Sequence, residues 1–173
     1  IGANVGYGWT PRAHIPALEH LPEFELAAVC TAHEETARES AEKFGVPSAY
    51  HNHHDMLSDA NLDVVAVVVR VPIHRQLTMD ILEAGKHVYT EWPLGANLAE
   101  GREMADLARS KGVQTMVGLQ SRTSPAFLTM KEMIADGYVG EVLSGHLDQT
   151  GAGVLSRPSG RTWQRDVTLG ANT

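Results

Sequence analysis

The stretch Asp63-Val-Val-Ala-Val-Val-Val69 decides the fold of this 173-residue chain. An unbroken run of β-branched residues is typical of a strand buried on both faces, as in a parallel sheet. The segments on either side alternate between apolar runs and amphipathic stretches. We expect further strands over 24–31, 48–50, 87–90 and 114–119, and helices over 11–20, 34–44, 54–58, 75–84, 98–111 and 124–136. Thr10 is expected to cap the first of these helices.

Alternating strands and helices predict an α/β fold, a doubly wound parallel Rossmann sheet joined by right-handed crossovers. We assign residues 1–122 to this dinucleotide-binding domain. Only Ile1 of its first strand precedes the glycine-rich stretch, so we expect that strand to be mostly missing and the chain to be a fragment. Residues 141–148 alternate polar and apolar, which predicts a strand exposed on one face. Residues 123–173 are therefore predicted to begin a second, incomplete domain.

Composition excludes several function classes. The chain is 43% hydrophobic with a formal net charge of −7, which excludes disorder. Its longest apolar runs fall far short of a membrane span, and it has no Lys/Arg cluster to bind nucleic acid directly. Its single cysteine excludes a disulfide framework. We expect a cytoplasmic protein that acts on a small-molecule substrate.

Ligands of open α/β sheets bind at the carboxyl ends of the strands. The glycine-rich stretch 2–8 lies there, where close backbone approach and helix N–H groups suit a pyrophosphate. Its spacing departs from the usual G-x-G-x-x-G pattern, so a plain glycine-rich turn stays an alternative. Thr31 stands where NAD-binding domains usually carry a carboxylate. A hydroxyl can donate to a 2′-phosphate and His33 adds partial positive charge, so NADP is favoured over NAD.

Two groups of histidines are interpreted without a ligand role. His51, His53 and His54 beside Asp55 invite a metal site, but a polar turn favours a solvated helix start. His14 and His20 are interpreted as surface or core residues. We expect no metal site.

The stretch Gly85-Lys-His-Val-Tyr-Thr-Glu-Trp-Pro-Leu94 resembles a signature of the Gfo/Idh/MocA family, named after glucose-fructose oxidoreductase, inositol dehydrogenase and rhizopine catabolism. The resemblance implies an NAD(P)-dependent oxidoreductase that transfers hydride to or from a sugar, polyol or related small substrate. It also implies that 123–173 opens a second α/β domain with a large, mostly antiparallel sheet for substrate binding and oligomerisation. A homodimer or homotetramer is then expected.

Three departures from the family pattern point to one branch. Trp92 replaces the usual lysine, Arg70-Val71 replaces a Pro-Asn pair, and the first loop reads Gly-x-Asn-x-x-x-Gly-Trp. These features resemble the branch that contains the fungal repressor of the galactose regulon. The alternative function is therefore a catalytically silent, NADP-binding transcriptional regulator.

The resemblance implies roles for the matching residues. Cofactor contacts are expected from Gly2, Asn4, Gly8, Trp9, Thr31, His33, Arg70, Val71, His74, Glu91, Trp92, Pro93 and Gln120. Arg122 and Trp163 are expected to border the substrate. The catalytic residue stays unassigned, because an indole at position 92 cannot transfer the proton that lysine handles. The partner histidine of the family is expected beyond residue 173.

Overall fold

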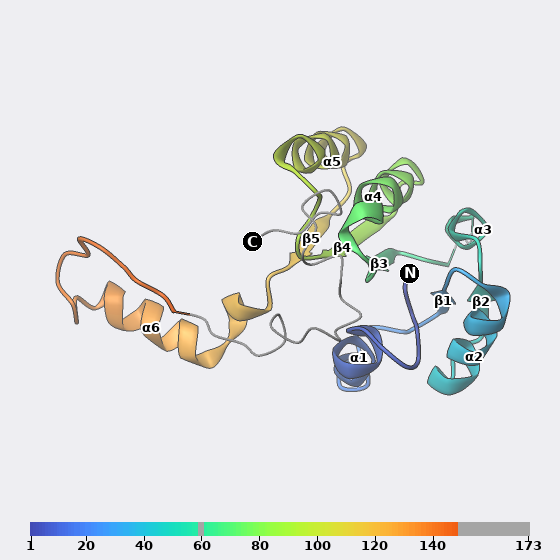
Figure 1. The fold of residues 1–173 in the computed structure, drawn as a ribbon, viewed down its shortest axis with the longest axis horizontal. Coiled ribbons are helices and arrows are strands. Elements are labelled where there is room, and N and C mark those ends of the chain that lie inside the picture. The colour runs from blue at the N-terminus through green and yellow to red at the C-terminus, as the bar shows by residue number, and fades with distance from the viewer. Residues whose placement is uncertain (59–60, 149–173) are drawn as a thin grey trace, which may run out of the picture.

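The computed structural model describes residues 1–58 and 61–148. Within this part of the chain, parallel strands form two ladders (Figure 1). One ladder pairs β1 (Ala28–Cys30) with β2 (Ser48–Tyr50), and the other has the order β3 (Val64–Val67), β4 (His87–Glu91), β5 (Thr115–Gly118). All pairs run parallel, as the sequence predicts.

The first two residues join the two ladders. The Ile1 nitrogen donates to the Ala66 carbonyl at 2.6 Å, and Val68 N–H donates to the Ile1 carbonyl at 3.0 Å. On the other side, Gly2 N–H donates to the Cys30 carbonyl at 2.8 Å. Ile1 and Gly2 therefore hold the central position between β1 and β3. The strand order reverses at this point, which is where open α/β sheets bind ligands.

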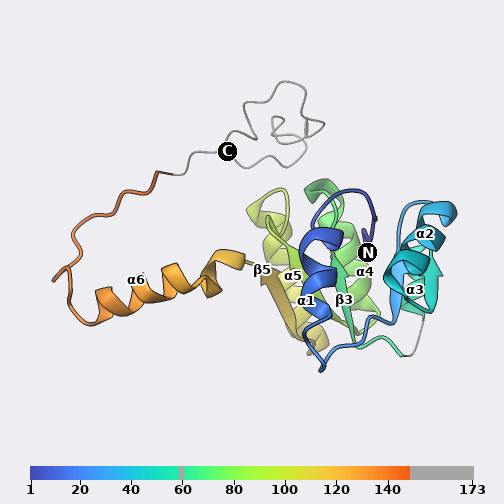
Figure 2. The same cartoon turned by 90° about the horizontal axis from the view of Figure 1, so that it is seen from below.

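Helices cover both faces of the sheet, which confirms the doubly wound Rossmann fold. On one face of the second ladder lie α4 (His74–Glu83) and α5 (Leu98–Lys111). A π-helical turn, Thr10–His14, runs into α1 (Ile15–Leu18) on the opposite face (Figure 2). The first ladder is flanked by α2 (Glu34–Phe44) and α3 (His53–Leu57). Short 3-10 turns span Val71–Ile73 and Gln120–Thr123, and α6 (Pro125–Ala135) extends away from the sheet.

One hydrophobic core spans both ladders. Cys30 of β1 and Met56 and Leu57 of α3 belong to the same buried cluster as Val65 of β3 and Ile81 of α4. Burial raises the pKa of the Cys30 thiol, consistent with a core residue. Because α3 and α4 share this cluster, the two halves of the sheet pack as one unit.

The two faces of β3 are unequally covered, which corrects the expected burial on both. Val65 and Val67 point towards α4 and are at most 4% exposed, whereas Val64 is 43% exposed. Met116 of β5 lies on the same face as Val64 by register and is 64% exposed. The short α1 covers too little of that face to bury either side chain. The π-helical turn that precedes α1 does reach the carboxyl end of β4, through His14.

Three local predictions were wrong. Of the strand expected over 24–31, only Ala28–Cys30 forms, because β2 offers three pairing residues. Thr10 does not cap its helix; its hydroxyl donates to the Gly2 carbonyl at 3.0 Å. Residues 141–148 form no strand, since no described segment pairs with them, and their side chains are exposed. Whether 123–173 opens a second domain stays a prediction.

Among the described residues, every helix is too short or too polar to cross a bilayer.

Candidate functional site

The glycine-rich loop is organised by its own polar groups. The Asn4 side-chain oxygen accepts from Gly6 N–H at 2.9 Å, and Asn4 N–H donates to the Gly2 carbonyl at 2.9 Å. The Thr10 hydroxyl closes the loop on that same carbonyl. Gly8 has φ +87°, a left-handed conformation that favours glycine. The loop is thus a defined turn from the central strand position into the first helix.

Gly2 is required by close packing as well as by its backbone conformation. Its φ is +87°, and a Cβ atom there would lie 2.1 Å from the Val68 carbonyl oxygen. Even alanine would collide with the chain that follows β3. The loop therefore approaches the end of β3 as closely as backbone allows.

Glu91, the last residue of β4, is the centre of the site. It is 5% exposed, yet its carboxylate has three side-chain partners. His14 Nε2 lies 2.7 Å from Oε1, and the Tyr89 hydroxyl donates to the same oxygen at 3.2 Å. Gln120 Nε2 donates to Oε2 at 3.0 Å. Three segments of the chain thus converge on one buried carboxylate.

These partners keep Glu91 ionised. Burial by itself raises the pKa of Glu91, but the hydrogen bond and charge of His14, with the Tyr89 and Gln120 hydrogen bonds, outweigh it. The net result is a pKa below the usual value. Burial, the adjacent Glu91 charge and their hydrogen bond raise the pKa of Tyr89 to about 12. Tyr89 is therefore a neutral donor at physiological pH.

Gly118, the last residue of β5, makes room for this cluster. A Cβ atom at Gly118 would lie 2.5 Å from the Tyr89 hydroxyl oxygen and 3.2 Å from Glu91 Oε2. The absence of a side chain lets Tyr89 lie against β5. His14 also packs edge-on against the Tyr89 ring, with centroids 5.5 Å apart.

His74, the first residue of α4, fixes two strand-end loops. It is 1% exposed, and its ring nitrogens lie 2.8 Å from the Pro93 carbonyl and 3.0 Å from the Val69 carbonyl. The Trp92–Pro93 peptide, which directly follows β4, is cis. Val71 is also buried, at 2%. The buried His74 ring thus lies between the backbone carbonyls of the loops that follow β3 and β4.

Thr31 is less available than the sequence suggests. Its hydroxyl lies 2.9 Å from the His33 carbonyl and 2.6 Å from the Thr36 hydroxyl, which itself lies 3.0 Å from that carbonyl. If Thr36 donates to Thr31, the Thr31 hydroxyl donates to the His33 carbonyl; if Thr36 donates to that carbonyl, the Thr31 hydroxyl donates to Thr36. The Thr31 hydrogen is therefore engaged in both arrangements. The premise that Thr31 donates to a 2′-phosphate is not met in this structure.

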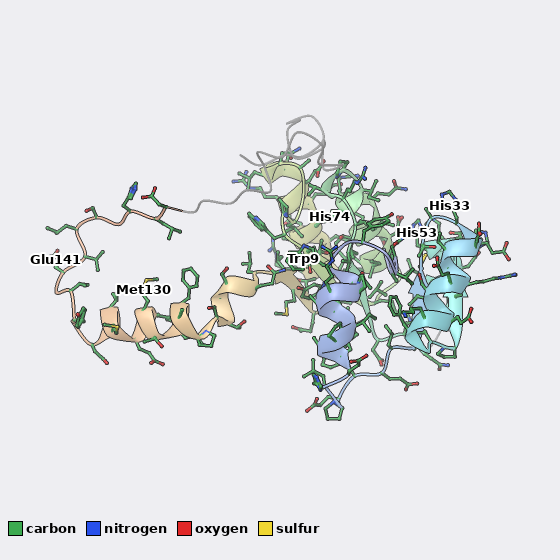
Figure 3. The ribbon with its side chains drawn as sticks, turned by 60° about the horizontal axis from the view of Figure 1, so that its bottom comes forward. Trp9, His33, His53, His74, Met130 and Glu141 are labelled. Atoms are coloured by element: carbon green, nitrogen blue, oxygen red, sulfur yellow. The ribbon has the colours of Figure 1, made fainter. Side chains whose placement is uncertain are left out.

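Several of the predicted site residues have exposed side chains. Trp9 and Trp92 are 58% and 60% exposed (Figure 3 labels Trp9 on the loop), and Pro93 is half-buried. The side chains of His33, Arg70, Gln120 and Arg122 are also exposed. All of these residues follow strand ends or belong to the first loop, as predicted. Trp163 lies outside the described residues.

His14 is the site residue that sequence reasoning missed. It was interpreted as an ordinary histidine, but it forms the shortest of the three contacts to Glu91. The signal that could have found it is position: it lies on the turn directly after the glycine-rich loop, at the same sheet edge. An ionised carboxylate held by an imidazole, a phenol and an amide can accept hydrogen bonds from a bound polyol or ribose.

Comparison with known proteins agrees with the fold. A family model described as "Oxidoreductase family, NAD-binding Rossmann fold" matches residues 3–119. The dehydrogenase aclE of Aspergillus oryzae is 37% identical over 152 residues, covering 87% of this chain and 42% of its own length. The galactose/lactose metabolism regulatory protein GAL80 of Saccharomyces cerevisiae is 29% identical, covering 83% of this chain and 35% of its own.

Solved structures share the fold. A levoglucosan dehydrogenase in complex with NADH and levoglucosan superposes with a TM-score of 0.80 at 25% identity, covering 96% of this chain and 47% of that one. A variant of a 3-ketoreductase from Actinomadura kijaniata, in complex with TDP-benzene and NADP, gives 0.68 at 26% identity, covering 74% and 40%. The chain thus spans less than half the length of each of these four relatives.

Proposed function

Because the chain belongs to the Gfo/Idh/MocA family of oxidoreductases with an NAD-binding Rossmann fold, we propose that it binds NAD(P) at the edge formed by the glycine-rich loop and Glu91. The protein would transfer hydride between this cofactor and a sugar, polyol or related small substrate. The observation that carries the proposal is the buried, ionised Glu91, held by three partners at the carboxyl end of β4.

Each part of the edge would do a different task. The loop of Gly2, Asn4, Gly8 and Trp9 would bring backbone N–H groups to the pyrophosphate. Thr31 and His33 would face the adenosine ribose. Glu91 would accept from the nicotinamide-side ribose, while exposed Arg70, Trp92 and Gln120 would flank the rings. His74 would position the two strand-end loops through the Val69 and Pro93 carbonyls, and Val71 would line the site as part of the loop that follows β3.

We propose NADP as the favoured cofactor, although one of the arguments for it, donation by the Thr31 hydroxyl, no longer applies. The Thr31 hydrogen is used within its own turn, so donation to a phosphate no longer supports the preference. What remains is that position 31 carries no carboxylate to repel a 2′-phosphate, with His33 exposed beside it. Either cofactor would supply or accept the hydride at its nicotinamide ring.

The substrate would lie against Trp92 and Arg122, with Trp163 as a further contact. An exposed indole stacks on the apolar face of a sugar ring, and a guanidinium donates to its hydroxyls. The catalytic proton would come from a group other than position 92, since an indole is neither an acid nor a base near neutral pH. We also propose the small-molecule substrate, the homodimer or homotetramer and the cytoplasmic location given above.

The regulator is the second candidate, and Trp92 is the observation that favours it. The side chain that replaces the family lysine is 60% exposed and carries no titratable group. The similarity to GAL80 agrees with this reading. Such a protein would bind NADP without turnover and signal to a protein partner.

A substrate screen separates the two candidates. The protein, extended to its natural length, is mixed with NADP⁺ or NAD⁺ and a panel of sugars and polyols, and nicotinamide absorbance is followed. Turnover that Arg122→Ala weakens mainly through KM supports the oxidoreductase. Tight cofactor binding with no turnover across the panel supports the regulator.

A further inference from the structure

His53, His54 and Asp80 form a side-chain cluster outside the proposed cofactor site. His53 Nε2 lies 2.8 Å from Asp80 Oδ2, and His54 Nε2 lies 3.9 Å from the same oxygen. One ligand-type atom of each residue lies within 4.8 Å of the other two. Figure 3 shows His53 on the α2 and α3 side of the molecule, apart from Trp9.

We propose that these three side chains bind one zinc ion, with water completing the coordination. Two imidazole nitrogens and one carboxylate oxygen are a donor set that zinc takes in three-ligand sites. Zinc bonds of about 2.0–2.2 Å place tetrahedral ligand atoms about 3.3 Å apart. The His53–Asp80 pair would open by about half an ångström and His54 would swing in by a similar amount.

The backbones that carry these ligands are fixed without the metal. The Asn52 side chain accepts from His54 N–H at 2.9 Å and so holds the start of α3. Met56 and Leu57 of α3 and Ile81 of α4 pack in the same buried cluster, which holds the two helices in place. The imidazole rings lie side by side, with centroids 4.0 Å apart. Only side-chain torsions must change for zinc to bind, which is the preorganisation a metal site needs.

The accessibility of the cluster fits a solvent-open site. The His53 and Asp80 side chains are 19% and 28% exposed, whereas that of His54 is 63% exposed. Zinc could therefore enter from solvent beside His54 and keep a water ligand on that side. Because α3 follows β2 of one ladder and α4 follows β3 of the other, the ion would link the two halves of the sheet.

His53 does lie at a helix start, as the first residue of α3, but its side chain contacts Asp80. The sequence places His51 and Asp55 beside the two histidines, but the structure selects Asp80, 27 residues from His53, as their common partner. His51 and Asp55 do not belong to the cluster. His51 is exposed, so it supplies a matched control on the same segment.

Isothermal titration of chelator-treated, untagged protein with zinc chloride tests the proposal. We expect one zinc per chain, with affinity at least about tenfold weaker in both His54→Ala and Asp80→Asn. His51→Ala should leave the affinity within about twofold of the unchanged protein. Zinc should also raise the thermal midpoint of the unchanged protein and not that of Asp80→Asn.

Three results would overturn the proposal: no stoichiometric uptake, equal uptake by His54→Ala and Asp80→Asn, or loss of uptake only in His51→Ala. The second would mean adventitious binding to other histidines. His54→Ala is an exposed change and should fold normally, which circular dichroism checks. Absorption of the cobalt-loaded protein adds a readout of four-coordinate geometry that a simple His53–Asp80 ion pair would not produce.

Discussion

His14 Nε2 lies 2.7 Å from Glu91 Oε1, so the turn after the glycine-rich loop is tied to the end of β4 across 77 positions of sequence. The contact brings an imidazole to a buried carboxylate at the carboxyl edge of the parallel sheet. It makes the position of the loop and the charge of Glu91 depend on each other.

His14→Ala should destabilise the protein by about 1–3 kcal/mol, the usual cost of removing a hydrogen bond to a charged group. Glu91 would stay buried with two partners instead of three. His20→Ala, at an exposed position just beyond α1, should stay within about 0.5 kcal/mol. Urea unfolding of both variants measures the difference. Equal stability of the two variants would contradict the role given to His14.

Glu91 should make the protein less stable in acid. Its folded-state pKa is lowered from 4.5, so the folded protein holds the ionised form more strongly than the unfolded chain does. This contribution is fully present above about pH 4.5 and is lost as the pH falls through the folded-state value. Unfolding free energies measured down to about pH 3 should fall less steeply in Glu91→Gln than in the unchanged protein. The same slope in both would remove Glu91 as the cause.

Tyr89 should ionise only at strongly alkaline pH. Its pKa is raised to about 12 by burial first and by the Glu91 charge and hydrogen bond second. Absorbance titration of tyrosinate should therefore contain a late component that is absent in Tyr89→Phe. Glu91→Gln should move this component to lower pH, though not to the ordinary value, because burial remains. A late component that persists in Tyr89→Phe would belong to another tyrosine.

Gly118→Ala should damage the same cluster by overpacking, at a cost of about 1–3 kcal/mol. The added methyl would lie 2.5 Å from the Tyr89 hydroxyl oxygen. Gly85 offers a control for loss of glycine itself, because no atom lies near its missing Cβ, although its φ of +71° makes alanine strained there. Gly118→Ala should shift the Tyr89 titration and Gly85→Ala should not. An unchanged tyrosine titration in Gly118→Ala would show that the cluster tolerates the methyl.

The sequence predicts best where local signals define an element. The helix predicted over 98–111 forms as Leu98–Lys111, because the Asn97 side chain caps its start and Gly112 ends it in a left-handed conformation. Strand bounds were less accurate, since a strand ends where its partner does, as β1 does opposite β2. The contacts of His14 with Glu91 and of His53 with Asp80 join distant segments. No pattern within either segment specifies its partner.

A titration with NADPH and, separately, NADH, followed by tryptophan fluorescence, tests the central claim most directly, because Trp9 and Trp92 are exposed at the proposed site. We predict saturable quenching by both, with NADPH favoured. Glu91→Gln should weaken binding at least about tenfold, and Glu103→Gln, an exposed change on α5, should not. Failure of both cofactors to bind, or equal binding by Glu91→Gln and the unchanged protein, would contradict the claim that this edge is a cofactor site.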